Sequence, residues 1–358
     1  MDSNPFDRST ADAQQKYTRT GLESKWDGLE GKKYRGGALT AGMPAISCRC
    51  CQASIKLTMM RSKLVGLSTW LAVATGVMLY GQEIPSESPI ELVRQTVSNE
   101  IRSNNGEAKF IFMDYKETPH ESQTKLIAET NDGTAGLLVE VNGKPLTPKQ
   151  REAEEARLDG LMHNPAELKK KQRAEREDAE RTNRIMKALP DAFLYQRDGT
   201  EIGSEGIGNP GDELVRLTFR PSPKYDPPSR TELVLTGMRG YILIDANRHR
   251  IAKIDGTLFK EVGFGWGILG HLDKGGRFVV QQGAVGDGDW EITRMDLSFT
   301  GRELLFKKLV IKSKESFSDF RPAPPNLTFA QAVELLKKQE AELAENHHQD
   351  RPENHDPR

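Results

Sequence analysis

Short apolar runs separated by turn-forming residues dominate the chain between Glu232 and Ser316. Val, Ile, Phe and Trp are frequent in these runs, and Gly and Asp mark many of their ends. Runs of this length and composition predict an antiparallel meander of strands. The expected strands are Leu233–Leu235, Tyr241–Ile244, Arg250–Ile254, Leu258–Val262, Arg277–Gln281, Trp290–Phe299 and Glu303–Ile311.

Two features of this stretch predict that the sheet is strongly curved. Along the predicted strand from Trp290, the apolar residues are at even-numbered positions at first and at odd-numbered positions from Met295 onward. An extra residue near Thr293-Arg294 would bring both sets to one face of the sheet, so we expect a bulge there. Glycines alternate with large apolar residues over 263–270, which allows a sharp bend. The fold class expected is therefore α+β, with a strongly curved antiparallel sheet, or half-barrel, and one concave apolar face.

Helical patterns precede and follow the predicted sheet. Ser88-Pro89 supplies an N-cap and a first-turn proline, and Thr328 supplies a cap for a C-terminal helix over 328–345. Residues 346–358 are polar and are expected to form a disordered tail. The apolar stripe of the first helix is Ile90, Val93, Val97 and Ile101.

Further strands are predicted between the first helix and the meander. Asn131-Asp132-Gly133 and Asn142-Gly143 are hairpin turn sequences that would join the earliest of them. The expected strands are 110–113, 124–129, 136–141, 192–196 and 213–220.

The segment 148–189 is rich in Glu, Arg, Lys and Ala, which are good helix formers. Pro165 divides it into two helices, with Asn164 as a cap. It is either a mobile arm or lid over an apolar concavity, or a solvated insertion with one face on the domain. Because charge runs usually mark exposed faces, the sequence favours the second interpretation.

The stretch Leu64–Tyr80 is almost continuously apolar and follows Arg61 and Lys63. This pattern is typical of a signal peptide, here residues 59–82. The alternative is an uncleaved anchor through 64–80, which would hold the protein at the inner membrane. We therefore expect a periplasmic or secreted protein.

Charge is distributed unevenly on either side of this apolar stretch. Residues 1–82 hold 11 Lys and Arg against 6 Asp and Glu, whereas the remainder holds 40 against 46. We therefore expect 1–58 to be a disordered or mis-assigned extension, and 83–327 to be the sheet domain with its helical insertion 148–189. The net charge of −1 argues against a dedicated nucleic-acid partner.

The sequence carries no recognisable catalytic or metal-binding pattern. The three cysteines, Cys48, Cys50 and Cys51, lie in the extension without the second ligand pair of a zinc site. No Gly-x-Ser-x-Gly elbow occurs. His271, beside Asp273, is interpreted as a surface histidine. We therefore expect neither an enzyme nor a bound metal or cofactor.

The layout resembles the outer-membrane lipoprotein carriers of the LolA/LolB type. The likeness rests on an exported chain with an N-terminal amphipathic helix, a curved antiparallel sheet and inserted helices. Segments 256–262, 264–267, 307–314 and 317–320 also look similar to secreted bacterial proteins of that type. The resemblance implies helices packed on the concave face of a half-barrel, and acyl chains held beneath a helical lid.

These observations predict a protein that binds an apolar ligand, such as a lipid or a lipoprotein acyl chain. The alternative is a non-enzymatic envelope interaction or regulatory module of the same fold, with a filled core and a protein partner. A cavity of about 300 Å³ or more would favour the first prediction. The candidate lining residues are Phe219, Leu235, Phe259, Phe264, Trp266, Phe278 and Trp290.

Overall fold

The computed structural model describes residues 87–104, 108–264, 270–286, 288–303 and 307–349. The predicted extension, the predicted signal peptide and most of the predicted tail lie outside these residues. The described part of the chain is α+β, with one large antiparallel sheet that does not close and five α-helices.

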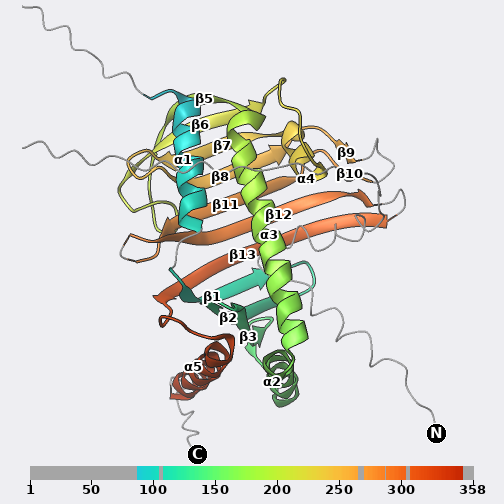
Figure 1. Ribbon diagram of the computed structural model, residues 1–358, viewed down its shortest axis with the longest axis vertical. Coiled ribbons are helices and arrows are strands. Elements are labelled where there is room, and N and C mark those ends of the chain that lie inside the picture. Colours follow the sequence, from blue (N-terminus) through green and yellow to red (C-terminus); the bar gives the residue numbers. More distant parts are fainter. Residues whose placement is uncertain (1–86, 105–107, 265–269, 287, 304–306, 350–358) are drawn as a thin grey trace, which may run out of the picture. The chain divides into compact units, whose positions relative to one another are not determined.

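The sheet places its strands in the order β4-β3-β2-β1-β13-β12-β11-β8-β7-β6-β5 (Figure 1). The short strands β9 and β10 pair with each other, and β10 also pairs with β12. The strands are β1 Phe110–Glu117, β2 Ser122–Thr130, β3 Gly133–Val141, β4 Lys144–Pro145, β5 Phe193–Ile202, β6 Glu213–Pro221, β7 Met238–Asp245, β8 Arg250–Leu258, β9 Val262–Phe264, β10 Gly270–Leu272, β11 Arg277–Ala284, β12 Trp290–Glu303 and β13 Lys307–Pro322.

Three of the helices begin at the caps that the sequence predicted. Ser88 Oγ accepts a hydrogen bond from Glu91 N at 3.4 Å, and Asn164 Oδ1 accepts one from Ala166 N at 3.1 Å. Thr328 Oγ1 likewise accepts from a backbone N–H in the first turn of the C-terminal helix. The helices are α1 Pro89–Asn104, α2 Pro148–His163, α3 Pro165–Ala192, α4 Arg230–Leu233 and α5 Phe329–Gln349.

The predicted strand at Leu233–Leu235 was wrong. Ser229 Oγ caps a short helix there, α4, by accepting from Thr231 N at 3.1 Å, and the 3₁₀ turn Val234–Gly237 follows. Gly237 approaches Val262 so closely that a Cβ would lie 2.5 Å from its Cγ2. A tightly packed turn therefore occupies a stretch whose composition favours a strand.

Several other boundaries differ from the prediction: β12 continues to Glu303, and the strand expected over Glu303–Ile311 is β13 at Lys307–Pro322. The strand expected over Leu258–Val262 is interrupted, because Phe259 N donates to Gly237 O at 2.9 Å instead of continuing the ladder. β8 therefore ends at Leu258, and β9 begins at Val262. The C-terminal helix continues to Gln349, four residues into the predicted tail, so the helix-forming stretch 340–345 is followed by one further turn of polar residues.

The predicted bulge at Thr293 is confirmed. Gln281 pairs with Arg294 and Gln282 pairs with Ile292, so Thr293 has no partner across the ladder. Its Oγ1 donates to Gly206 O at 2.6 Å. The bulge therefore ties the glycine-rich loop after β5 to the sheet.

Helices contact both faces of the sheet. On one face of β1–β3, Leu126 and Leu137 belong to a buried cluster with Val333 and Leu336 of α5. On the other face, α1 and α3 cross the strands, as Figure 1 shows, and α1 contributes Leu92 to a second buried cluster. Among the described helices, none combines the length and the apolar composition that a bilayer span requires.

Candidate functional site

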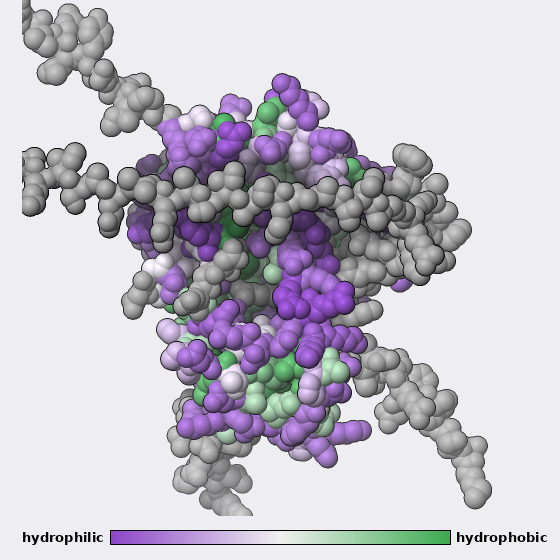
Figure 2. All heavy atoms as spheres, viewed as in Figure 1, coloured by the Kyte–Doolittle hydropathy of each residue, from purple (hydrophilic) through white to green (hydrophobic). Residues whose placement is uncertain are grey.

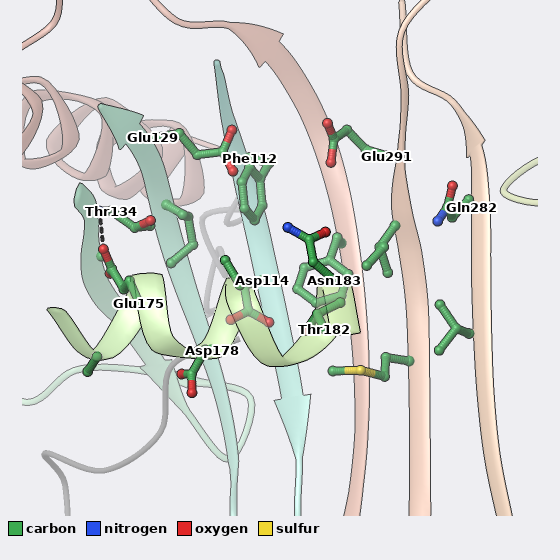
Figure 3. A pocket seen from close by; sticks show the side chains of 18 of the residues that line it. Phe112, Asp114, Glu129, Thr134, Glu175, Asp178, Thr182, Asn183, Gln282 and Glu291 are labelled. Carbon is green, nitrogen blue, oxygen red and sulfur yellow. Dashed lines mark hydrogen bonds between the residues drawn. The ribbon is translucent and has the colours of Figure 1, made fainter. Parts of the chain in front are cut away.

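A cavity of about 1400 Å³ lies between helix α3 and the sheet. Its wall includes residues of α2 and α3 and of strands from both halves of the sheet, from β3 to β5. Figure 3 shows α3 crossing in front of the strands, with Glu175 beside Thr134 of β3 and with Asp178 and Thr182 on either side of Asp114 of β1 in this view. Figure 2 shows apolar surface within a hollow at the middle of this face, between polar margins.

Helix α3 is attached to the rest of the domain near both ends. Near its start, Gln172 Nε2 donates to Asp132 O at 2.6 Å, and Glu175 Oε2 accepts from Thr134 N at 3.2 Å (Figure 3). Near its end, Leu189 is buried in the same cluster as residues of α1. We call these two attachments the turn latch and the core anchor.

Between the two attachments, α3 passes over the cavity without closing it. Ala174, Ala179 and Thr182 line the cavity, yet all three are exposed. The cavity is therefore open to solvent along the middle of the helix. Helix α3 therefore lies across the cavity, and residues of its middle are exposed to solvent.

The end of the cavity near the core anchor is apolar. Ile185 and Met186 of α3 face it from above, and Ile242, Ile254 and Val280 form part of its floor. Burial raises the pKa of the Tyr195 phenol, whose O–H donates to Leu189 O at 2.9 Å. This end therefore offers mostly hydrocarbon to a ligand.

The predicted lining residues divide into three groups. Phe219, Leu235, Phe278 and Trp290 line the cavity. Phe264 is packed in the core with 3% exposure, and Phe259 lies outside the wall, with the Arg239 guanidinium 5.6 Å from its ring centroid. Trp266 lies outside the described residues.

Sequence reasoning missed the wall formed by β1–β3. Phe112, Ile127 and Leu138 line the cavity from these strands, whereas the residues that alternate with them pack against α5 and α2. The sequence did indicate this wall in the run Phe110–Met113, where the residues that point to either face of the strand are all apolar. Such a run is typical of a strand with both faces covered.

The other end of the cavity is polar and is organised by Glu154 of α2. This carboxylate is 8% exposed and accepts hydrogen bonds from Leu138 N at 2.8 Å and from Arg157 Nε at 2.7 Å. Arg157 Nη2 also donates to Gly136 O at 2.7 Å. The pair therefore fixes α2 to the edge of β3.

Lys125 of β2 lines the same polar end. Asp114 stands opposite it in the β1–β2 register. Burial lowers the pKa of the Lys125 ammonium, and this effect exceeds the attraction of Asp114. Among the described residues, none forms a hydrogen bond or ion pair with its Nζ.

A buried ion pair joins α1 to the cavity wall. Glu100 is 1% exposed, and its Oε1 accepts from Arg250 Nε at 3.0 Å and from Ile251 N at 2.7 Å. Burial raises the pKa of this carboxyl despite the Arg250 charge. Glu100 and Arg250 therefore pair with each other within the protein and hold α1 against β8.

One group outside the cavity has the composition of a metal site. Single ligand atoms of Glu261, His271 and Asp273 all lie within 4.8 Å of one another at the β9–β10 hairpin. His271 Nε2 is 3.3 Å from Asp273 Oδ1, and Thr300 Oγ1 donates to Asp273 Oδ2 at 2.6 Å. Three such ligands could hold a divalent cation with an open position. His271 is half-buried, and none of the three lines the cavity.

The fold and the site together define a class of protein: an open antiparallel sheet with a helix attached across a large cavity, which is apolar at one end and polar at the other. No protein-family model matches the chain, and no curated protein matches it. The likeness to lipoprotein carriers therefore stays a prediction from the sequence.

Proposed function

We propose that this protein binds an apolar ligand, such as a lipid or a lipoprotein acyl chain, in the cavity beneath α3. The cavity volume of about 1400 Å³ is the observation that supports this function. It is above the range of about 300–1000 Å³ that is usual for small-molecule sites. A filled core was the feature expected of the alternative, an envelope interaction or regulatory module, so the cavity favours the binding function.

Burial of hydrocarbon is sufficient to explain such binding. Each methylene group transferred from water contributes about 0.8 kcal/mol, so a long acyl chain supplies several kcal/mol without any reactive group. Ile185, Met186 and Ile254 would contact the chain from opposite sides of the cavity. This function requires no catalytic residue, cofactor or metal.

The proposal extends to architecture and location. The sheet would be a half-barrel with α1 and α3 on its concave face, and α3 would act as the lid. The protein would be exported and would work in the periplasm or outside the cell. Cell fractionation with N-terminal sequencing of the recovered protein tests the location, and a cytoplasmic protein that retains residues 1–58 would contradict it.

Native purification tests the binding function directly. The protein is purified from the envelope fraction, and lipids that co-purify are identified by mass spectrometry. We expect a lipid or acylated molecule in near-stoichiometric amount. Protein that carries no lipid, and that does not bind a fluorescent fatty acid after purification, would contradict the proposal.

A bulky residue beneath α3 tests the place of binding. Ala179 lines the cavity, whereas its neighbour Glu180 is exposed and does not. We expect Ala179→Trp to weaken binding of the fluorescent fatty acid by about tenfold or more, and Glu180→Trp to leave it unchanged. Equal affinity in the two variants would place the ligand elsewhere.

A further inference from the structure

We propose that the ligand is an anionic amphiphile whose carboxylate or phosphate headgroup binds Lys125, with its tail beneath the C-terminal half of α3. This inference rests on the proposed function and adds the chemical class of the ligand. It also assigns a specificity-determining residue at the polar end of the cavity.

The register of β2 fixes Lys125 on the cavity face. Gln123, Lys125 and Ile127 line the cavity, whereas Leu126 and Ala128, which alternate with them, belong to the cluster with α5. A shift by one residue would bury the lysine among the apolar side chains of that cluster. The ammonium is therefore held at the cavity wall by the packing of the opposite face.

The neighbouring cations already have partners in the protein. Arg157 donates to Glu154 and to Gly136 O, and Lys171 pairs with Glu175. Lys116 pairs with Glu315 across the β1–β13 ladder. Lys125 has no hydrogen bond or ion pair with another described residue, so it can bind an incoming anion.

Charged groups of both signs surround Lys125. Asp114 and Glu154 attract the ammonium, whereas Arg157 and Lys116 repel it. With Glu315, the partner of Lys116, the three carboxylates and three cations balance, and Lys125 is the cation of this group without a hydrogen bond or ion pair to another described residue. Burial lowers the pKa of the ammonium. A ligand anion would supply the counter-charge that a buried cation requires.

The apolar part of the cavity gives the tail its direction. Ile127 follows Lys125 on the same face of β2, and Phe112 lies on the adjacent strand β1. Further along the sheet, Phe278 and Ile254 continue the apolar wall toward the core anchor. A single-chain amphiphile can therefore place its head at Lys125 and its hydrocarbon along the floor of β11 and β8.

Paired ligands and matched variants test the inference. Palmitate and hexadecanol share a chain and differ in headgroup charge, and their affinities are measured by calorimetry for the wild type, Lys125→Met and Lys169→Met. Lys169 of α3 is exposed and does not line the cavity. We expect the wild type and Lys169→Met to prefer palmitate by about 10- to 100-fold, as charge-assisted hydrogen bonds allow. We expect Lys125→Met to bind both ligands equally.

The outcomes separate this inference from the function on which it rests. If neither ligand binds the wild type, the proposed function fails. If both bind and Lys125→Met keeps the preference for palmitate, only the role of Lys125 fails. Unchanged hexadecanol affinity shows that the variant is folded. A lysophosphatidic acid with the same acyl chain distinguishes a phosphate from a carboxylate headgroup. The headgroup whose ligand loses more affinity in Lys125→Met is the one that Lys125 selects.

Discussion

Glu154 is a buried carboxylate whose bonds join helix α2 to strand β3. Its Oε1 accepts the Leu138 N–H at 2.8 Å. Arg157 donates two further bonds to this carboxylate. The residue therefore stabilises the polar end of the cavity through one contact within its own helix and one with a strand 16 residues earlier in the chain.

Removal of this carboxylate should destabilise the domain. We expect Glu154→Ala to lower the free energy of unfolding by about 2–3 kcal/mol, because it removes the acceptor of the part-buried Leu138 N–H and breaks the charge-assisted bonds with Arg157. Glu155→Ala, at the exposed next position, should change it by less than about 0.5 kcal/mol. Urea denaturation measures both, and equal values would show that Glu154 has no structural role.

Lys125 should reduce stability at neutral pH. Its pKa is lowered in the folded protein, so the unfolded chain binds the proton more tightly and stability rises with pH through the folded pKa. We expect Lys125→Met to be more stable than the wild type at pH 7 by about 0.5–2 kcal/mol, as favourable replacements commonly are. The difference should narrow toward about pH 10, near the ordinary pKa of lysine. If the stability difference between Lys125→Met and the wild type stays constant over this pH range, the pKa of Lys125 is not lowered in the folded protein.

The residues that the sequence predicted well are those whose role is local. Ser88, Asn164 and Thr328 cap helices through backbone groups only two or three residues away, so composition and spacing identify them. Glu154 and Lys125 could not be recognised in this way. Their roles depend on strands and helices that come together only in the fold.

Helix α3 acts as a single element because it is attached at two separate places. The turn latch holds its first half through Gln172 and Glu175, and the core anchor holds its last turn. Gly133, in the turn beneath the latch, has φ +112, and a Cβ there would lie 2.9 Å from Glu175 Oε2. A glycine is therefore required where the helix meets the hairpin.

Gly133→Ala should release the first half of α3. We expect faster amide hydrogen exchange over residues 165–180, together with a loss of about 1–3 kcal/mol for the strained backbone. Gly143→Ala is the matched control, because its φ is +68 and no atom lies within 4 Å of the added Cβ. If the control raises exchange over 165–180 equally, the latch is not what restrains the helix.

At the level of elements, sequence periodicity located most strands but not their order. The change of phase between Trp290 and Met295 correctly identified the bulge at Thr293. The pairing of β1 with β13 joins segments about 200 residues apart, and no local pattern specifies it. The cavity also depends on this pairing, since its wall combines strands from both sides of β13.

The whole domain should be more stable when the cavity is filled. A ligand that binds only the folded state stabilises it by about 2.7 kcal/mol at 100 times its Kd. We therefore expect delipidated protein to unfold at a lower temperature, and added palmitate to restore the original value in a concentration-dependent way. Differential scanning calorimetry measures this change, and the Ala179→Trp variant should show a smaller restoration at the same palmitate concentration.

The main strand order of the open sheet also ends in two outer strands that could recruit a strand from another molecule. β4 has only two residues, Lys144–Pro145, and proline offers no N–H for pairing. β5 is longer, but its ladder is irregular between Arg197 and Thr200, and Asp198 places a charge there. Short, charged and irregular borders oppose edge-to-edge aggregation. Neither border therefore offers the long regular row of backbone groups on which a strand of another molecule would extend the sheet.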